Sequence, residues 1–264
     1  MFEDSILIVA HPDDEVLWLS SVVDKVERIV FCFNDDPGSP GMGAARRKVI
    51  NEYPFQNVTS LDIEEPQSFN KADWDQPVIT DYGIKLSKCD QSDTRYKATF
   101  EYLHSRVREL VADRKNVFTH NPWGEYGHED HVLVYRVLSA LQQEFHFNLW
   151  FSNYCSNHSA SLMDQYISGF HPDYQCLSVN LMLAEKIADV YRKNGCWTWY
   201  EDYQWFNSEC LMKNVLSADQ DKTLNYGHIS PLNYIKIFIG TQRPQQSLLA
   251  RIGSRLKGSF RNTS

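Results

Sequence analysis

The chain has 264 residues, of which 42% are hydrophobic and 23% charged, and this composition excludes an intrinsically disordered protein. A formal net charge of −8 argues against nucleic acid as the main partner. The six cysteines are widely spread without a Cys-x-x-Cys pair, which indicates reduced, mostly packed thiols. No apolar run approaches the roughly 20 residues of a transmembrane helix, and Glu3 and Asp4 are unlike a signal peptide. We therefore expect a cytoplasmic protein.

Apolar runs typical of strands alternate with helical patterns along the chain. Strands are predicted at residues 5–9, 28–33, 57–63, 116–119, 147–151 and 175–179. Helices are predicted at residues 16–26, 44–53, 94–112, 132–141 and 180–193. This alternation predicts an α/β, Rossmann-like fold whose mostly parallel sheet carries helices on both faces.

We expect one domain over residues 1–264, with a catalytic core at about 1–155 and a substrate-side elaboration at about 156–242. Residues 64–93 are polar and irregular, as lids and binding loops often are. Residues 243–264 form a basic, amphipathic tail without acids. This tail could contact an anionic membrane, dock on the acidic body of the protein, or stay frayed.

Residues that can bind metal or move protons follow two of the predicted strands. His11 and Asp14 are three positions apart after the first strand, and His128 and His131 are three apart after residues 116–119. In a parallel sheet, both groups emerge at the same edge, where ligands bind. Two histidines and one carboxylate are a common zinc shell with a position open for water. One imidazole and one carboxylate then remain for proton transfer.

The sequence Ala-His-Pro-Asp-Asp-Glu at residues 10–15, directly after a strand, resembles the signature of the LmbE-like, or PIG-L, de-N-acetylases. Gly-His-Glu-Asp-His at residues 127–131 is similar to the second motif of that superfamily. The superfamily includes N-acetylglucosaminyl-phosphatidylinositol deacetylases and mycothiol-pathway deacetylases. Beyond about residue 155 no family pattern indicates the substrate, which commonly varies on a shared fold.

The resemblance implies a metal centre and a base. His11, Asp14 and His131 match the zinc ligands of the family. Asp13 matches its general base, and this role suits a carboxylate that lies beside a ligand without being one. The alternative is that Asp13 is an ordinary acid at a helix start.

The resemblance also implies roles around the acyl group. His128 matches the histidine that protonates the leaving amine or stabilises the oxyanion. Asp130 matches an acid that orients this histidine, and Tyr126 matches a tyrosine near the substrate carbonyl. An acid in a first turn and a tyrosine in a loop are also common without any function.

Substrate contacts are less well determined. The family often places an arginine in the helix after the second strand, and both Arg46 and Arg47 lie there, so the choice between them stays open, as does a merely solvated basic face. Asp35 or Asp36, in the loop after the second strand, could bind sugar hydroxyls or shape the turn. Trp123 could stack on a sugar ring. The aromatic run at 197–206 could be a sugar platform, core or an interface.

We therefore expect a zinc-dependent hydrolase, with Fe²⁺ as another candidate metal, that deacetylates an N-acetylated amino sugar such as a GlcNAc-type glycoconjugate. Asp13 is the expected base and His128 the expected acid. The substrate could be a nucleotide- or lipid-linked glycan or a small glycoconjugate, and a lipid-linked one would place the protein at the inner membrane surface. Two alternatives stay open: a non-haem iron oxygenase with the same ligands, and a non-catalytic carbohydrate-binding protein. The glycan, the acyl group and the oligomeric state are not predicted.

Overall fold

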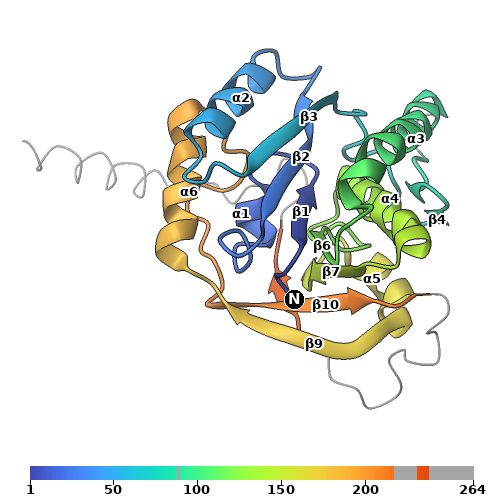
Figure 1. The fold of residues 1–264 in the computed structure, drawn as a ribbon. Helices are drawn as coiled ribbons and strands as arrows, with labels where there is room; N and C mark the ends of the chain where they lie inside the picture. The colour runs from blue at the N-terminus through green and yellow to red at the C-terminus, as the bar shows by residue number, and fades with distance from the viewer. Residues whose placement is uncertain (88–89, 217–230, 238–264) are drawn as a thin grey trace, which may run out of the picture.

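The computed structural model describes residues 1–87, 90–216 and 231–237. Within these residues the central sheet has seven strands in the order β3-β2-β1-β6-β7-β10-β9 (Figure 1). Its strands are β1 (Ser5–Val9), β2 (Arg28–Asp35), β3 (Val58–Glu64), β6 (Asn116–Thr119), β7 (Asn148–Ser152), β9 (Phe170–Ser178) and β10 (Ser208–Asn214). The strands from β3 to β7 in this order pair in parallel, and β10 runs antiparallel to both β7 and β9. The expected mostly parallel α/β sheet is confirmed.

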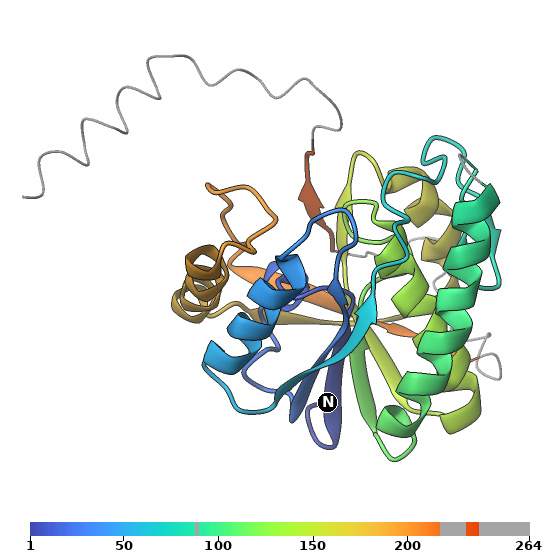
Figure 2. The same cartoon turned by 90° about the horizontal axis from the view of Figure 1, so that it is seen from above.

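Helices cover both faces of the sheet (Figure 2). The helices are α1 (Asp14–Trp18), α2 (Met42–Glu52), α3 (Asp90–Val111), α4 (Glu129–Phe145), α5 (Ala160–Tyr166), the short η1 (Ile167–Gly169) and α6 (Leu181–Asn194). Ile6 and Ile8 of β1 pack in the core under α3 and α4, whereas Leu7 and Val9 pack in the core under α1, α2 and α6. This alternation follows from the two-residue period of a strand and explains why β1 is apolar throughout.

Two small sheets complete the described part of the chain. β4 (Ile79–Thr80) and β5 (Gly83–Ile84) form an antiparallel pair within the polar region 64–93. β8 (Tyr154–Ser156) and β11 (Asn233–Ile235) pair in parallel. These elements, together with α5 and β10, carry no strong periodic pattern, and none of them was predicted from the sequence.

The sheet places the two motifs next to each other. β1 pairs with β2 on one side and with β6 on the other, and Leu7 lies opposite Phe118 in the β1–β6 register. The strand order therefore reverses at β1, and the carboxyl ends of β1 and β6 lie side by side. Such a reversal creates the crevice in which α/β proteins bind ligands.

The first helix is much shorter than the predicted span of residues 16–26. The carbonyls of Val16 and Leu17, which a longer helix would use, accept hydrogen bonds from Trp205 Nε1 at 2.6 Å and from the Tyr203 hydroxyl at 3.3 Å. Beyond Trp18, the backbone N–H groups of Ser20 and Ser21 donate to the carboxylate of Glu209. Val22, Val23 and Val26 are still buried although they lie beyond the helix. The apolar spacing of residues 16–26 therefore corresponds to burial of the segment and not to a continuous helix.

The five described cysteines are free thiols, in agreement with the composition. Four of them are buried; Cys176 is exposed and lies opposite Cys210 across the β9–β10 pair. Among the described residues, no helix combines the length and apolar character needed to cross a membrane. Cys89 and the basic tail at 243–264 lie outside the described residues.

Candidate active site

A cavity of about 500 Å³ opens at the carboxyl ends of β1 and β6. Of the residues singled out from the sequence, its lining includes His11, Asp13, Asp14, Arg46, Tyr126 and His128. The lining also includes Asp36, Trp199 of the aromatic run, and three residues with no predicted role: Glu65, Phe69 and Thr198. Its volume lies in the range of small-molecule sites.

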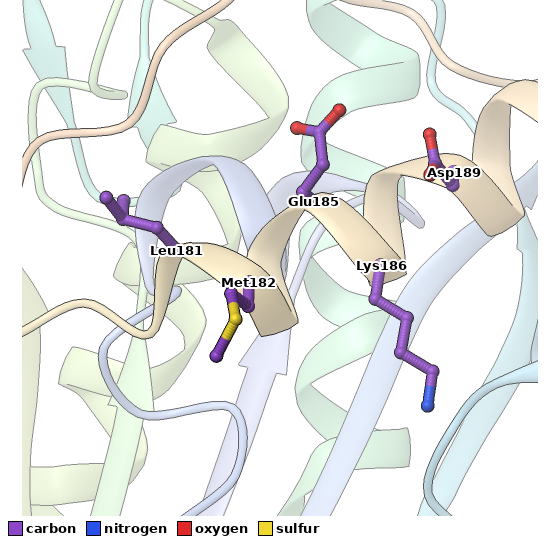
Figure 3. A pocket seen from close by; sticks show the side chains of 5 residues that line it. All are labelled: Leu181, Met182, Glu185, Lys186 and Asp189. Carbon is purple, nitrogen blue, oxygen red and sulfur yellow. The ribbon is translucent and has the colours of Figure 1, made fainter.

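A second hollow of similar volume, about 510 Å³, lies along the exposed surface of α6. Its lining consists of Leu181, Met182, Glu185, Lys186 and Asp189. These side chains project from one helix without converging on a common point (Figure 3), and none is an imidazole. The two cavities cannot be distinguished by volume. We take the first as the candidate active site because histidines and carboxylates converge in it.

The three predicted metal ligands converge. His11 follows β1, Asp14 begins α1, and His131 lies in the first turn of α4. Potential ligand atoms of the three residues all lie within 4.8 Å of one another. His11 Nδ1 is 3.2 Å from Asp14 Oδ2, and His131 Nε2 is 3.1 Å from Asp14 Oδ1. All three residues are buried.

The state of His131 fits a metal ligand. Its Nε2 atom is buried and makes no hydrogen bond with the described residues, because its close approach to Asp14 lacks hydrogen-bond geometry. Its Nδ1 atom lies 2.7 Å from Glu125 Oε2. A carboxylate there holds a hydrogen on Nδ1, so that a bound cation would take the lone pair of Nε2 and displace any proton from it, as in many metal centres. A divalent cation would satisfy this otherwise unpaired buried atom.

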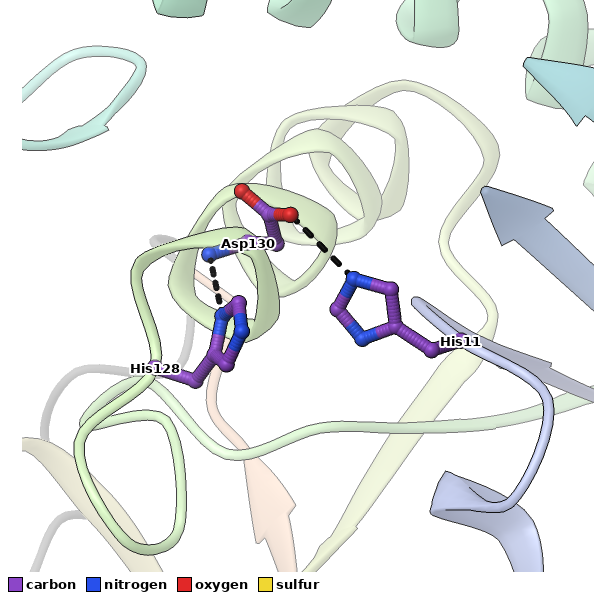
Figure 4. A group of neighbouring side chains, drawn as sticks. All are labelled: His11, His128 and Asp130. Atoms are coloured by element: carbon purple, nitrogen blue, oxygen red, sulfur yellow. Dashed lines mark hydrogen bonds and ion pairs between the residues drawn. The ribbon is translucent and has the colours of Figure 1, made fainter. Parts of the chain in front are cut away.

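Two other groups of residues could hold a metal and overlap with the first. One consists of His11, His128 and Asp130, and the other of His120, Glu125 and His131. Figure 4 shows Asp130, at the start of α4, reaching His11, which follows β1; Asp130 Oδ2 lies 3.2 Å from His11 Nε2. The potential ligands thus form one connected cluster rather than an isolated triad.

The electrostatics of the two adjacent aspartates differ sharply. Burial raises the pKa of Asp13 to about 7, and the neighbouring Asp14 carboxylate contributes to this rise. Burial also opposes ionisation of Asp14, but His131, His11 and His120 outweigh it and hold its pKa well below the usual range. Asp14 is thus an anion suited to binding a cation, and Asp13 can exchange a proton near neutral pH.

His11 and His131 are surrounded by acids. Burial lowers the pKa of each imidazole, but the surrounding carboxylates raise it more. The net pKa of His131 is about 9, with Asp14 and Glu125 as the raising groups, and that of His11 lies well above 6.5. The carboxylates that favour a proton on these imidazoles would also favour a divalent cation bound between them.

His128 has the opposite environment. Burial and the nearby imidazoles of His131 and His11 lower its pKa well below 6.5, so it is neutral at pH 7. The backbone N–H of Asp130 donates to His128 Nδ1 at 3.1 Å (Figure 4). A neutral ring whose Nδ1 accepts a hydrogen bond carries its hydrogen on Nε2. The geometry thus favours the second predicted role, hydrogen bonding to an oxyanion, over proton donation as an imidazolium.

Asp130 contacts His128 through its backbone rather than its carboxylate. Its Oδ2 faces His11, and its Oδ1 accepts a hydrogen bond from the hydroxyl of Ser68. The expectation that this acid orients His128 through its side chain is therefore not matched by the geometry. Ser68 lies in the irregular region 64–93, and no sequence signal singled it out.

The loop before α4 depends on glycine. Gly124 has a positive φ of 66°, and a Cβ there would lie 2.5 Å from the carbonyl oxygen of His128. Only glycine tolerates both the conformation and the close approach. The ring of Tyr126 is thereby held against the cavity, with its centroid 5.8 Å from that of His128 and 4.7 Å from that of Trp199.

The structure separates the two candidate arginines. Arg46 is buried, lines the cavity and donates from Nη1 to Glu65 Oε1 at 2.6 Å. Arg47 is exposed and pairs with Asp35 and Asp62 outside the cavity. Asp35 forms a salt bridge with Arg47 and does not line the cavity. The adjacent Asp36 does line it.

Trp123 does not lie in the cavity, so the expected sugar contact is wrong. It is fully buried in the core, where its Nε1 donates to the carbonyl of Tyr154 at 2.5 Å. Its position in the motif loop suggested exposure, but the loop folds inward against β7. Trp199, from the aromatic run at 197–206, does line the cavity. The sequence missed the adjacent Thr198, which binds Asp13, because it lies after α6, far from either motif.

The family is decided by the match of residues 6–141 to the model of PIG-L, described as GlcNAc-PI de-N-acetylase. The chain belongs to the PIG-L family. This match spans both motifs and confirms the LmbE-like resemblance, and PIG-L membership supports a carbohydrate de-N-acetylase. No curated protein matches the chain.

Solved structures show the same fold at low identity. A deacetylase in complex with teicoplanin is 12% identical with a TM-score of 0.52, covering 81% of this chain and 99% of that one. The zinc-inhibited form of a teicoplanin deacetylase is 13% identical with a TM-score of 0.55 and the same coverage. An antimicrobial pseudoaglycone deacetylase is 11% identical with a TM-score of 0.53, covering 80% of this chain and 96% of that one. These likenesses establish the LmbE-like fold of this PIG-L protein.

Proposed function

We propose that this PIG-L protein is a metal-dependent hydrolase that removes the acetyl group from an N-acetylated amino sugar or its glycoconjugate. The observation that carries the proposal is the convergence of His11, Asp14 and His131 beside Asp13, whose pKa is raised to about 7. Family membership supports the substrate class, with N-acetylglucosamine as its first representative.

In the proposed site, His11, Asp14 and His131 hold a divalent metal, with Zn²⁺ as the first choice and Fe²⁺ as the second. The unpaired Nε2 of His131 and the anionic Asp14 support this assignment. One neighbour is described in a zinc-inhibited form. When bound, such an ion would polarise the acyl oxygen and lower the pKa of a water molecule to about 7.

Asp13 moves the proton in this proposal. Asp13 is only 1% exposed and lines the cavity next to the proposed metal ligands. It accepts a proton from the attacking water, and its raised pKa lets it return that proton to the nitrogen of the leaving amine. The acid role predicted for His128 thereby passes to Asp13, because the lowered pKa of His128 leaves that ring neutral.

His128 and Tyr126 stabilise the developing charge. The Nε2–H of neutral His128 donates a hydrogen bond to the oxyanion, which is the kind of contact that commonly lowers acyl-transfer barriers. The pKa of Tyr126 is raised well above 10 by burial and by Asp14 and Asp13, so its hydroxyl keeps its hydrogen. Tyr126 can therefore donate to the same oxygen.

The sugar is proposed to lie between the loop after β2 and the aromatic side chains at the mouth of the cavity. Asp36 and Arg46 supply polar contacts, and Phe69 and Trp199 supply apolar walls. A nucleotide-linked, lipid-linked or small glycoconjugate could extend outward from this mouth. A cytoplasmic location and a membrane contact through residues 243–264 stay proposals from the sequence.

The test follows acetate release from N-acetylglucosamine conjugates. We expect Asp13→Ala to lower kcat/KM by roughly 10²–10⁴-fold, the usual contribution of an acid–base group. Chelation should abolish activity, and added Zn²⁺ or Fe²⁺ should restore it. Arg47→Ala is a matched control, because this exposed arginine lies outside the cavity and should leave the rate unchanged. Full activity after complete metal removal would refute the proposed function.

The two alternatives have their own outcomes. Oxygen consumption coupled to a co-substrate would favour the iron oxygenase, against which the PIG-L match argues. Sugar binding without turnover across a broad panel of N-acetyl compounds would favour the non-catalytic protein.

A further inference from the structure

Thr198 binds the side chain of Asp13 from a distant part of the chain. Its backbone N–H and its hydroxyl both donate to Asp13 Oδ2, at 3.0 and 2.7 Å. Thr198 follows the end of α6, where Gly195 turns the chain with a φ of 72°. It is 185 positions from Asp13 and outside the family match at residues 6–141.

This contact replaces the bond that an acid at a helix start usually makes. Asp13 is the N-terminal capping residue of α1, where a carboxylate normally accepts an N–H of its own helix. The Asp13 side chain makes no such bond, and it turns toward Thr198 instead. The orientation of the carboxylate is therefore determined by the segment after α6.

The two hydrogen bonds distinguish the oxygens of Asp13. Both donors of Thr198 go to Oδ2, and no hydrogen bond among the described residues reaches Oδ1. Because Asp13 lines the cavity, Oδ1 is the oxygen that can meet a water molecule there.

The backbone of Asp13 is held as tightly as its side chain. Its φ of 104° lies in a region that non-glycine residues rarely adopt, and such strain persists only where surrounding contacts enforce it. The N–H of Asp13 donates to Glu15 Oε2 at 3.1 Å, and Glu15 Oε1 accepts from Tyr191 of α6 at 2.9 Å. α6 and the residues after it thus hold Asp13 at both the main chain and the carboxylate.

We propose that Thr198 is a positioning residue for the reaction, which fixes Oδ2 of Asp13 so that Oδ1 faces the attacking water. This inference rests on the proposed function, because it assumes that Asp13 is the base. A general base must be held within hydrogen-bond reach of the proton it takes, and small misplacements are costly in rate.

The test compares Thr198→Val with Thr198→Ser. Valine keeps the shape and the backbone N–H but removes the hydroxyl, so we expect kcat to fall by roughly 10- to 100-fold with KM nearly unchanged. Serine should restore kcat to within about threefold of the wild-type value, because it supplies the same hydroxyl. Zn²⁺ affinity, measured by calorimetry, should be unchanged in both variants. Thr59→Val is the matched control, since it removes a half-buried hydroxyl that contacts Arg28 on the sheet.

A double-mutant cycle supplies a readout without turnover. Urea unfolding of the metal-free protein with Thr198→Val, Asp13→Asn and both changes measures whether the two side chains are coupled. The inference is overturned if the coupling is absent, if folded Thr198→Val keeps the wild-type kcat, or if Thr198→Ser is as slow as Thr198→Val. A wild-type protein that releases no acetate from any N-acetyl glycoside would instead refute the proposed function and remove the basis of this inference.

Discussion

Glu125 illustrates how much of the site depends on a residue outside both motifs. It is fully buried, and its Oε2 lies 2.7 Å from His131 Nδ1 and 3.1 Å from His120 Nδ1. His120 in turn accepts the N–H of Ala10 at 2.8 Å and stacks on His131 with ring centroids 3.8 Å apart. Glu125 therefore fixes the ring of a proposed metal ligand and ties the end of β1 to the loop before α4.

Replacing Glu125 with glutamine should weaken metal binding. The neutral amide is a poorer acceptor for two imidazoles, so we expect Zn²⁺ affinity to fall by roughly 10- to 100-fold, as is usual for such supporting groups. Glu129→Gln is a matched control, because Glu129 is equally buried but binds Ala72 and Trp74 rather than histidine. Titration calorimetry with equal losses in the two variants would contradict this role.

Most of the predicted residues that the structure brings to the cavity lie in or beside the two motifs; Arg46 of α2 is an exception. The motif residues were identified from strand ends, spacing and resemblance. The structure brings His11, Asp13, Asp14, His128 and His131 together at the cavity or the proposed metal centre. Thr198, Glu125 and Ser68 could not be found this way, because their partners are distant or their residue types are common in any loop. Trp123 failed because a position within a motif loop does not determine whether a side chain points inward.

At the scale of elements, α6 acts as a support for the first motif. Tyr191 of α6 and Tyr53 after α2 donate to Glu15 Oε1 at 2.9 and 3.0 Å. Trp205 and Tyr203, in the segment after α6, bind the carbonyls of α1 and end that helix. Since these contacts are tertiary, the helical spacing of residues 16–26 could not reveal them.

Tyr191→Phe should destabilise the protein without unfolding it. The change removes one hydrogen bond to a buried carboxyl, and we expect a loss of about 0.5–1.5 kcal/mol in the free energy of unfolding. Urea unfolding at a constant m-value would measure it. Tyr102→Phe serves as the control, because that tyrosine is 51% exposed on α3. Equal stability of the two variants would show that the contact with Glu15 is not important.

At the scale of the whole molecule, the site concentrates buried ionisable groups that ordinary folding would avoid. Burial raises the pKa of Glu15 to about 8 and that of Glu129 to about 7, and carboxylates raise that of His131 to about 9 despite its burial. In each case the folded protein binds the proton more tightly than the unfolded chain. Each group therefore stabilises the fold below its unfolded pKa, and this contribution is lost as the pH rises through the folded value.

The metal-free protein should consequently lose stability between pH 7 and pH 9. Glu15 and His131 both titrate in this window, and the expected loss is on the order of 1–3 kcal/mol. Urea unfolding in the presence of a chelator at the two pH values measures it. Zn²⁺ should raise the unfolding midpoint at both pH values, because we expect the ion to bind the folded site more tightly than the unfolded chain. Metal-free stability that is constant or rises with pH would contradict the assignment.

The overall architecture was predictable because it follows from repeated local patterns. Alternating apolar strands and helices indicated the parallel sheet from β1 to β7, and β6 was predicted at its observed bounds. The antiparallel β10 was missed, because a strand containing Glu209 and Lys213 has no clear apolar run. The buried carboxylate of Glu209 is satisfied by Ser20 and Ser21 after α1 and by the hydroxyl of Tyr154.

The hydrogen bonds from Thr198, after α6, to Asp13 have a consequence for chimaeras made between this protein and its relatives. The matched portion at residues 6–141 contains every residue proposed to touch the acetyl group, so it would be the obvious portion to transfer into another protein. Yet Thr198 and Tyr191, which support Asp13 and its neighbour Glu15, come from outside that portion. We therefore expect a chimaera that exchanges the region after residue 155 for that of a relative to have an altered orientation of Asp13, the proposed base. On the proposed function, such a chimaera would change its glycan specificity and its catalytic rate together.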